Sequence, residues 1–293
     1  MLPIESNSID ANCDPDTLAE RIVQRTRRSP IVLVRNAAPH LEAFEALTDR
    51  FARMQMHRRA DLALDNHGAR RGLSQKGSTT VNLGHEEVPL HRERAYTPLS
   101  PEVLCFYCVD APSSPAPTTM LDGCDLYERL PSDLRAWADE TSVLYEESFA
   151  LNEQLRRLVC DAYGVETIEE VRERMPVIAR TLMPDDTFEL KEFTDDRISY
   201  TIVAPLVRRK TRQGQPALVT TIRWARRALS NGRPGSEDPQ WRRLERLLVA
   251  NEVEHHWHKG DLVVMDNNGA MHGRRAHEAP DRTIAIRMGR WAA

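Results

Sequence analysis

The chain has 293 residues, of which 41% are hydrophobic and 29% charged, with a formal net charge of −4 at pH 7. This is the composition of an ordinary globular protein, long enough to bury a substantial core. Nucleic-acid-binding proteins usually show a basic excess, which is missing here. No apolar run approaches the roughly 20 residues that cross a bilayer. We therefore expect neither a nucleic-acid partner nor a membrane span.

The N-terminal stretch and the cysteines indicate a compartment. Residues 1–16 are polar and acidic and lack the charged-then-apolar order of a secretory signal. Five cysteines at irregular spacing do not make a disulfide framework. Cys105 and Cys108 form a CxxC, but residues three apart on a strand point to opposite faces, so we interpret them as two buried thiols. The sequence thus predicts a cytoplasmic protein.

The predicted elements open as helix, strand and helix. Leucine, isoleucine and valine at helical spacing predict a helix over 16–28, with Asp14 or Asp16 as its N-cap. A short buried strand follows at 31–37, and an amphipathic helix is expected over 40–54.

The remainder is rich in short strands. Strand-like texture punctuated by prolines runs over 78–122. Further extended segments are expected at 187–193, 198–207, 217–224, 261–267 and 282–291. Helices are expected at 126–130, 131–141, 151–175 and 240–251. Many short strands with helices around them predict one mainly β domain, 1–293, built as a sandwich or barrel. There is no βαβ alternation, GxGxxG or phosphate loop, which disfavours a nucleotide-binding fold.

Two segments carry candidate metal ligands. His91 and Glu93 stand two residues apart in VPLHRERAY, so on an extended segment both side chains project from one face. Alone, this pair is more typical of an ordinary surface strand. The segment 257–274, WHKGDLVVMDNNGAMHGR, adds His272 after a strand and a turn. Two histidines and one carboxylate leave three positions of an octahedral metal open, which suits Fe(II) enzymes that bind a co-substrate and O2 together.

Arginines on the last predicted strand are candidates for binding a co-substrate. A guanidinium offers a planar fork to a carboxylate. A 2-oxoglutarate that chelated iron through its keto acid end would leave its far carboxylate in need of such a partner. Arg282 is the first candidate and Arg287 the second. Arg287 lies an odd number of residues away and would face the other side of a regular strand.

Together the two segments resemble the TauD/TfdA and clavaminate-synthase-like group of Fe(II)/2-oxoglutarate dioxygenases. The series LHRERAY, PEVLCFYCVDAP and SSPAPTTMLDG is similar to the family's H-x-D/E strand, hydrophobic strand, turn and acidic residue. The C-terminal part is similar through GD, LVVM, DN and HGR, followed by the later arginine strand. The similarity runs from about residue 30 to the C-terminus. It is weakest over 151–240, where we expect a substrate-specific insert.

The resemblance implies a mainly β fold with flanking helices, a double-stranded β-helix or jelly roll of the cupin type. It implies three iron ligands, which are His91, Glu93 and His272. It also implies Arg282 on the 2-oxoglutarate carboxylate and Thr118 as a hydroxyl donor to it. The family's glycine pair before that threonine is replaced by PAP at 115–117, so the turn differs and Thr119 is a near substitute.

The implied activity uses Fe(II), 2-oxoglutarate and O2 and releases succinate and CO2. Relatives that install halogen have a small residue in place of the carboxylate ligand, so Glu93 favours hydroxylation or desaturation. A glutamate rather than an aspartate resembles the clavaminate-synthase branch, whose substrates are often amino acids or derivatives. The expected substrate is therefore a small amino-acid-like molecule of specialised metabolism, either free or tethered to a carrier protein.

Several other polar residues are candidates for lesser roles. Asn267 and Arg274 are expected either to support the site from outside or to serve as turn residues. Candidates for the substrate mouth are His85 and Glu86, and also His67 unless it is simply solvated. The histidines at 255, 256 and 258 precede the GD turn and are expected to lie away from the pocket without a function. Charged side chains that could contact a zwitterion are Glu146, Glu147, Asp185, Asp186, Arg223, Arg226 and Arg227.

Two other classes of function stay open at this point. A metal enzyme on the same barrel that does not use 2-oxoglutarate would share the three ligands but would not need Arg282. A non-catalytic ligand-binding jelly roll would need no ligand triad. Succinate formation discriminates against the first alternative, and an iron titration against the second.

Overall fold

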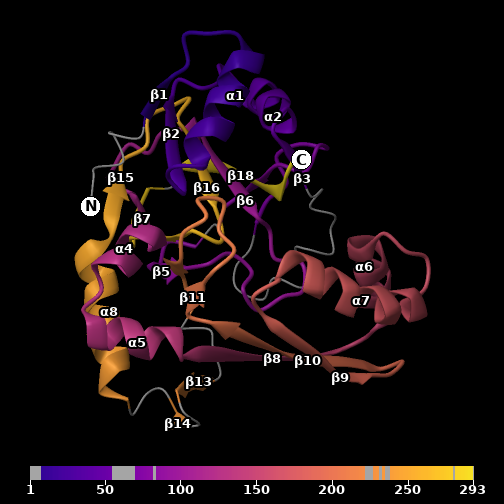
Figure 1. Cartoon of the computed structure of the whole chain (residues 1–293). Helices are drawn as coiled ribbons and strands as arrows, with labels where there is room; N and C mark the ends of the chain where they lie inside the picture. The colour runs from indigo at the N-terminus through magenta and orange to yellow at the C-terminus, as the bar shows by residue number, and fades with distance from the viewer. Residues whose placement is uncertain are drawn as a thin grey trace.

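Two β-sheets pack face to face in the protein (Figure 1), whose computed structural model describes residues 8–54, 70–81, 84–221, 227–230, 233–234, 238–279 and 281–292. The larger sheet has the order β1-β2-β16-β6-β18-β3, with β4 beside β18, and the smaller has the order β15-β7-β17-β5. The strands of the larger sheet are β1 (Ser8–Asp10), β2 (Ile31–Arg35), β3 (Ala52–Met54), β4 (Thr79–Thr80), β6 (Val103–Asp110), β16 (Leu262–Asp266) and β18 (Thr283–Trp291). Those of the smaller sheet are β5 (Val88–His91), β7 (Thr118–Asp122), β15 (Val253–His255) and β17 (Ala270–Arg274).

Successive side chains along each strand point to opposite faces of the larger sheet, so a hydrophobic core forms on each face. Phe106 and Ile286 of the larger sheet pack with Met120 of the smaller one, in the core between the sheets. Cys108 belongs to this core, whereas Cys105 belongs to the core on the opposite face. The two buried thiols therefore point to opposite sides of β6, as the period of a strand requires. The expected jelly roll with flanking helices is confirmed.

Two helices cover the outer face of the larger sheet. They are α1 (Pro15–Thr26) and α2 (Leu41–Asp49). Asp14 is the N-cap of α1, and its side chain accepts hydrogen bonds from the backbone N–H groups of Asp16 and Thr17. The helix expected over 40–54 is too long, because α2 ends at Asp49 and the next residues form β3. Pairing with β18 overrides the helical pattern there. Gly289 permits this approach, since a Cβ at that position would lie 2.4 Å from the Arg53 carbonyl oxygen.

A second lobe extends from the jelly roll. It contains a sheet of order β14-β13-β8-β10-β9, with α6 and α7 beside it (Figure 1). Its elements are β8 (Ser142–Ala150), α6 (Glu153–Tyr163), α7 (Ile168–Leu182), β9 (Thr187–Phe193), β10 (Arg197–Pro205), β13 (Arg227–Ser230) and β14 (Arg233–Pro234). The remaining elements are α4 (Gly123–Arg129), α5 (Ser132–Asp139), β11 (Val207–Arg208), β12 (Ala217–Leu218) and α8 (Pro239–Asn251). The lobe thus begins at β8, earlier in the chain than the insert expected from residue 151. Of the strand expected over 217–224, the structure describes residues 217–221, and only β12 (Ala217–Leu218) is a strand there.

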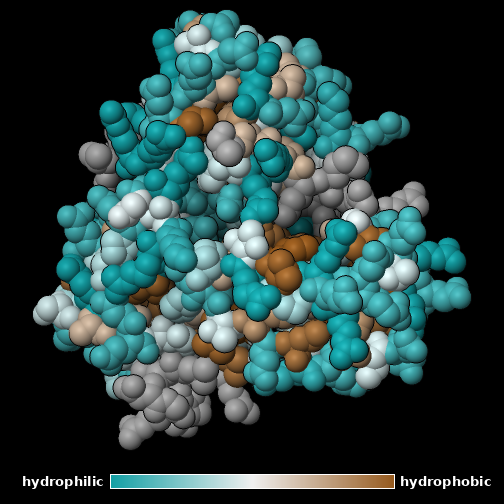
Figure 2. Space-filling view, turned by 45° about the vertical axis from the view of Figure 1, so that its right-hand side comes forward, coloured by the Kyte–Doolittle hydropathy of each residue, from teal (hydrophilic) through white to brown (hydrophobic). Residues whose placement is uncertain are grey.

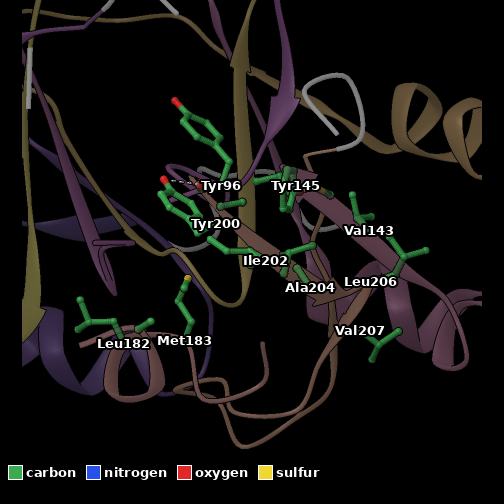
Figure 3. Packing of buried hydrophobic residues seen from close by; sticks show 14 of the residues in the cluster. Tyr96, Val143, Tyr145, Leu182, Met183, Tyr200, Ile202, Ala204, Leu206 and Val207 are labelled. Atoms are coloured by element: carbon green, nitrogen blue, oxygen red, sulfur yellow. Dashed lines mark hydrogen bonds between the residues drawn. The ribbon is translucent and has the colours of Figure 1, made fainter. Parts of the chain in front are cut away.

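The second lobe shares one hydrophobic core with the jelly roll. Alternate residues of β10, such as Tyr200 and Ile202, are buried and pack against Tyr145 of β8 (Figure 3). The same cluster includes Leu121 of β7 and Met271 of β17. On the surface, apolar side chains gather in the lower part of the face shown in Figure 2, where this lobe lies, and hydrophilic side chains dominate elsewhere. Among the described helices, none has the length and apolar character needed to cross a membrane.

Candidate active site

The smaller sheet brings two histidines directly opposite each other. His91 ends β5 and is the antiparallel partner of His272 in β17, with ring centroids 4.2 Å apart. Glu93 reaches them from the turn after β5, where Arg94 has a positive φ of 52°, rather than from the strand itself. One Glu93 carboxylate oxygen, Oε2, lies 3.3 Å from His272 Nε2 and 3.6 Å from His91 Nε2. Ligand atoms of these three residues all lie within 4.8 Å of one another.

The electrostatics of this cluster suit a divalent metal. His91 Nδ1 lies 2.9 Å from the Pro89 carbonyl oxygen, which can accept its proton, and Nε2 is then the ring nitrogen that faces Glu93. Burial and the neighbouring His91 lower the pKa of His272 to about 4, so this imidazole is neutral at pH 7. Burial opposes ionisation of Glu93, but Arg70 and the two histidines outweigh it and hold its pKa well below the usual range. An ionised carboxylate between imidazole nitrogens is a donor set for Fe(II).

Side-chain hydrogen bonds fix the backbone that carries Glu93. Asn267, which is fully buried, accepts the Glu93 N–H at 2.9 Å and donates to the Glu93 carbonyl at 3.0 Å and the Pro101 carbonyl at 2.8 Å. The Thr221 hydroxyl accepts the Arg92 N–H at 3.1 Å and donates to the Arg92 carbonyl at 3.0 Å. The segment from His91 to Glu93 is therefore held on both sides by groups that do not themselves face a metal.

Gly273 explains the close packing around His272. A Cβ at this position would lie 2.5 Å from the Val88 carbonyl oxygen and 2.7 Å from Thr119 Oγ1. Only glycine lets β17 approach β5 and β7 at this point, and that approach sets His272 opposite His91.

Arg282 and Thr118 form a candidate carboxylate-binding pair in the cavity that His91, Glu93 and His272 also line. Arg282 donates through Nη2 to Thr118 Oγ1 at 3.1 Å, and Trp257 donates through Nε1 to the same oxygen at 2.9 Å. Because that oxygen accepts two hydrogen bonds, the hydroxyl proton of Thr118 is available to a further acceptor. Burial and the charge of Arg274 lower the pKa of Arg282 to about 10, which leaves the guanidinium charged at pH 7. Thr119 does not line the cavity.

Sequence reasoning missed two residues of this region. Trp257 stands in a polar segment rich in histidine. A single large aromatic residue in such a segment was the only sign in the sequence that this side chain is buried. Arg70 donates to Glu93 Oε1 at 2.9 Å and has a side chain that is 10% exposed. No motif surrounds it, and only the tertiary fold brings it to Glu93.

One cavity of about 740 Å³ contains the triad and the carboxylate-binding pair. This volume accommodates 2-oxoglutarate together with a small substrate. Its lining includes His85, Glu86, Arg274 and Tyr96. His85 and His277 pack against each other, with ring centroids 5.1 Å apart.

Other candidate residues lie elsewhere. Among the described residues of 151–240, none lines this cavity, and neither does Glu146 or Glu147. Asp185 accepts the backbone N–H groups of Arg209 and Lys210, and Asp186 pairs with Arg208. His67, Arg223 and Arg226 lie outside the described residues, as does the side chain of Arg227.

Arg287 has a different environment from Arg282. It is buried on the opposite face of β18, where its guanidinium donates to the Glu45 carbonyl at 2.9 Å and to the Thr48 hydroxyl and pairs with Asp49 at 2.8 Å. It does not line the cavity, and these contacts tie β18 to α2.

The histidines at 255 and 258 surround a different carboxylate. Oδ2 of Asp261 accepts the His258 backbone N–H at 2.9 Å and the Arg35 guanidinium at 2.5 Å, and lies 3.5 Å from His255 Nε2. These contacts hold the turn before β16 and lie apart from the cavity.

Comparisons with known proteins agree with this geometry. The family described as "Taurine catabolism dioxygenase TauD, TfdA family" matches residues 6–288. A taurine dioxygenase from Burkholderia xenovorans has 14% identity and a TM-score of 0.59, over 97% of this chain and 84% of its own. AAD-2 in complex with Mn(II) and N-oxalylglycine has 13% identity and a TM-score of 0.60, over 97% and 91%. A B. xenovorans protein assigned as an alpha-ketoglutarate-dependent 2,4-D dioxygenase has 18% identity and a TM-score of 0.57, over 96% and 92%.

A search of curated proteins found no relative by sequence. The family match covers nearly the whole chain, and the similar structures share its fold at low identity. This match excludes both a metal enzyme that does not use 2-oxoglutarate and a non-catalytic jelly roll. The chain belongs to the TauD/TfdA family and is a dioxygenase that depends on Fe(II), 2-oxoglutarate and O2.

Proposed function

We propose that His91, Glu93 and His272 bind the iron and that Arg282 and Thr118 bind the far carboxylate of 2-oxoglutarate. The observation that carries this proposal is the presence of the triad and the Arg282–Thr118 pair in one cavity. The complex of AAD-2 with Mn(II) and N-oxalylglycine, on the same fold, supports a metal and a small dicarboxylate binding together.

Each residue contributes a defined part of the chemistry. When bound, Fe(II) supplies the activation of O2 that couples decarboxylation of 2-oxoglutarate to oxidation of the substrate. His91 and His272 offer imidazole nitrogen atoms, and Glu93 offers an oxygen on the same side. Arg70 holds the other Glu93 oxygen, which orients the carboxylate. Because a carboxylate fills the place where halogen-installing relatives carry a small residue, the outcome is hydroxylation or desaturation.

The proposed substrate is a small amino-acid-like molecule of specialised metabolism, free or tethered to a carrier protein. Beyond the triad and Arg282, the cavity is lined by basic side chains, Arg70, Arg94 and Arg274, and by acidic ones, Glu86 and Glu87. Groups of both signs complement a molecule that carries a carboxylate and an ammonium group. All five cysteines are free, which supports a reducing location such as the cytoplasm.

An anaerobic titration tests the cofactor assignment. Adding Fe(II) and then 2-oxoglutarate to the metal-free protein should give a weak visible charge-transfer band. The band should be absent in His272→Ala and should need roughly 10- to 100-fold more 2-oxoglutarate in Arg282→Ala, because a charged hydrogen-bonded partner is lost. Arg290→Ala, on the same strand but outside the cavity lining, is the matched control and should behave as wild type. Bound iron without a band in the wild type would refute the proposed 2-oxoglutarate site.

Substrate-dependent succinate formation tests the substrate class. Free amino acids and their carrier-bound thioesters should stimulate succinate release above the level seen with 2-oxoglutarate alone. Stimulation by taurine or by 2,4-D, the compounds named for the structural neighbours, with none by amino acids would contradict the amino-acid assignment.

A further inference from the structure

A second, much smaller cavity lies behind the ligand-bearing turn. Arg92 stands between His91 and Glu93 in the sequence, yet it lines this separate cavity of about 10 Å³ and not the active site. The other polar lining residues are Tyr145, Arg208 and Thr220. Val143 and Ala204 form part of its apolar wall, and both appear with Tyr145 in Figure 3. A space of this size holds one water-sized particle.

The cavity is bordered by more positive than negative charge. Arg92 is 1% exposed and Arg208 is 2% exposed. Asp186 binds the Arg208 guanidinium through both carboxylate oxygens, but its Oδ2 lies 3.7 Å from Arg92 Nη1. Arginine side chains stay protonated in proteins, so both guanidinium groups carry a positive charge. An uncompensated buried charge is costly.

The next carboxylate does not supply the missing charge. Asp266 acts on Arg92 less strongly than Asp186 does. Its oxygens accept the backbone N–H groups of Arg212 and Asn268.

Several hydrogen-bond donors on these residues lack an acceptor. Within the described structure, Arg92 Nε, Arg92 Nη1 and Thr220 Oγ1 are buried without a hydrogen-bond partner. Buried polar groups in proteins nearly always find a partner, and three such atoms on the walls of one cavity indicate a missing acceptor.

We propose that this cavity binds a monatomic halide ion, chloride in the cell, between Arg92 and Arg208. A single atom fits the volume, whereas phosphate or a carboxylate does not. A water molecule would satisfy some donors but would leave the excess positive charge, and a halide satisfies both requirements. The bound ion fixes the Arg92 side chain and thereby the turn between His91 and Glu93. The site stands on its own contacts and does not depend on the proposed substrate or cofactor ligands.

Bromide substitution locates the ion directly. Crystals of the wild-type protein grown with bromide as the only halide should give an anomalous difference peak in the cavity within hydrogen-bond distance of Arg92. A peak at the level of water, with no anomalous signal, would show that water fills the cavity and would overturn the proposal.

Thermal unfolding at constant ionic strength tests binding in solution. Replacing gluconate, which is too large to enter, by chloride should raise Tm by ~2–4 °C for each tenfold increase in chloride above its dissociation constant. The rise should be lost in Arg92→Met, which removes the excess charge, and reduced in Thr220→Val, which removes one donor at nearly constant volume. The matched control is Arg209→Met, which removes the same charge from an exposed neighbour of Arg208.

The outcomes separate a specific site from a general salt effect. An equal chloride response in Arg92→Met and in the wild type would refute the site. If Arg92→Met does not fold, the Thr220→Val response and the bromide peak still decide the question.

Discussion

At the scale of single residues, the hydroxyl of Thr118 carries a specific expectation. It accepts hydrogen bonds from Arg282 and Trp257, which leaves its proton for the 2-oxoglutarate carboxylate that we propose to bind there. Thr118→Val should raise the 2-oxoglutarate concentration for half-maximal succinate formation by ~10-fold or more, because a hydrogen bond to a charged group is lost. The KM for the substrate should change little.

Thr119→Val is the matched control for this prediction. Thr119 lies next to Thr118 on the same strand but does not line the cavity, so its variant should require the wild-type concentration of 2-oxoglutarate. An equal effect of both substitutions would assign the loss to the strand and not to the hydroxyl of Thr118.

The residues that could be predicted from the sequence share one property. His91, Glu93, His272, Thr118 and Arg282 stand in short segments whose order and spacing resemble a family pattern. Arg70 and Trp257 reach the same cavity through contacts between distant parts of the chain, and no local spacing encodes such contacts. Arg287 shows that a charge on the right strand is not sufficient, because side chains alternate between the two faces.

At the scale of secondary-structure elements, the junction of β7 and α4 has a pH-dependent stability. Asp122 caps α4 by accepting the N–H groups of Cys124 and Asp125, and burial raises its pKa to about 6. A raised pKa favours the protonated form in the folded state. The contribution of Asp122 to the free energy of unfolding is therefore fully present below pH 4 and is lost as the pH rises through about 6.

Asp122→Asn tests this dependence, because asparagine keeps the cap without the charge. Its free energy of unfolding in urea should exceed that of the wild type by about 1–3 kcal/mol at pH 7 and by little at pH 4. A similar difference at both values would show that the charge is not responsible.

Sequence patterns predicted helices and strands well where the hydrophobic period decided the structure. The α1 cap at Asp14, the buried strand at 31 and the last strand follow from local pattern. The end of α2 does not, because residues 52–54 continue a helical pattern but pair with β18. The start of the second lobe at β8 could not be seen either, because its partners β10 and β13 lie far along the chain.

At the scale of the whole molecule, we propose that the chain 1–293 unfolds as one cooperative unit, because the two lobes share a hydrophobic core. Ile202 is fully buried in β10, within the cluster that also contains Leu121 and Met271 of the jelly roll. Ile202→Ala should lower the free energy of unfolding by about 2–5 kcal/mol, because a buried side chain is replaced by a cavity. Unfolding should remain a single transition that coincides by far-UV circular dichroism and tryptophan fluorescence.

Val249→Ala is the control for this substitution, because Val249 lies on α8 and is 66% exposed. Two separated transitions in Ile202→Ala, with only one of them shifted, would show that the lobes unfold independently and that 1–293 is more than one domain.

The pairing of His91 with His272 also determines when iron-binding capacity can arise during synthesis. His91 and Glu93 leave the ribosome long before β17, which supplies His272, and Arg282 follows later still. A nascent chain that stops before β17 has two of the three candidate ligands and none of the strand that holds them in register. Iron retention is therefore a property of the chain only after β17 has emerged and paired.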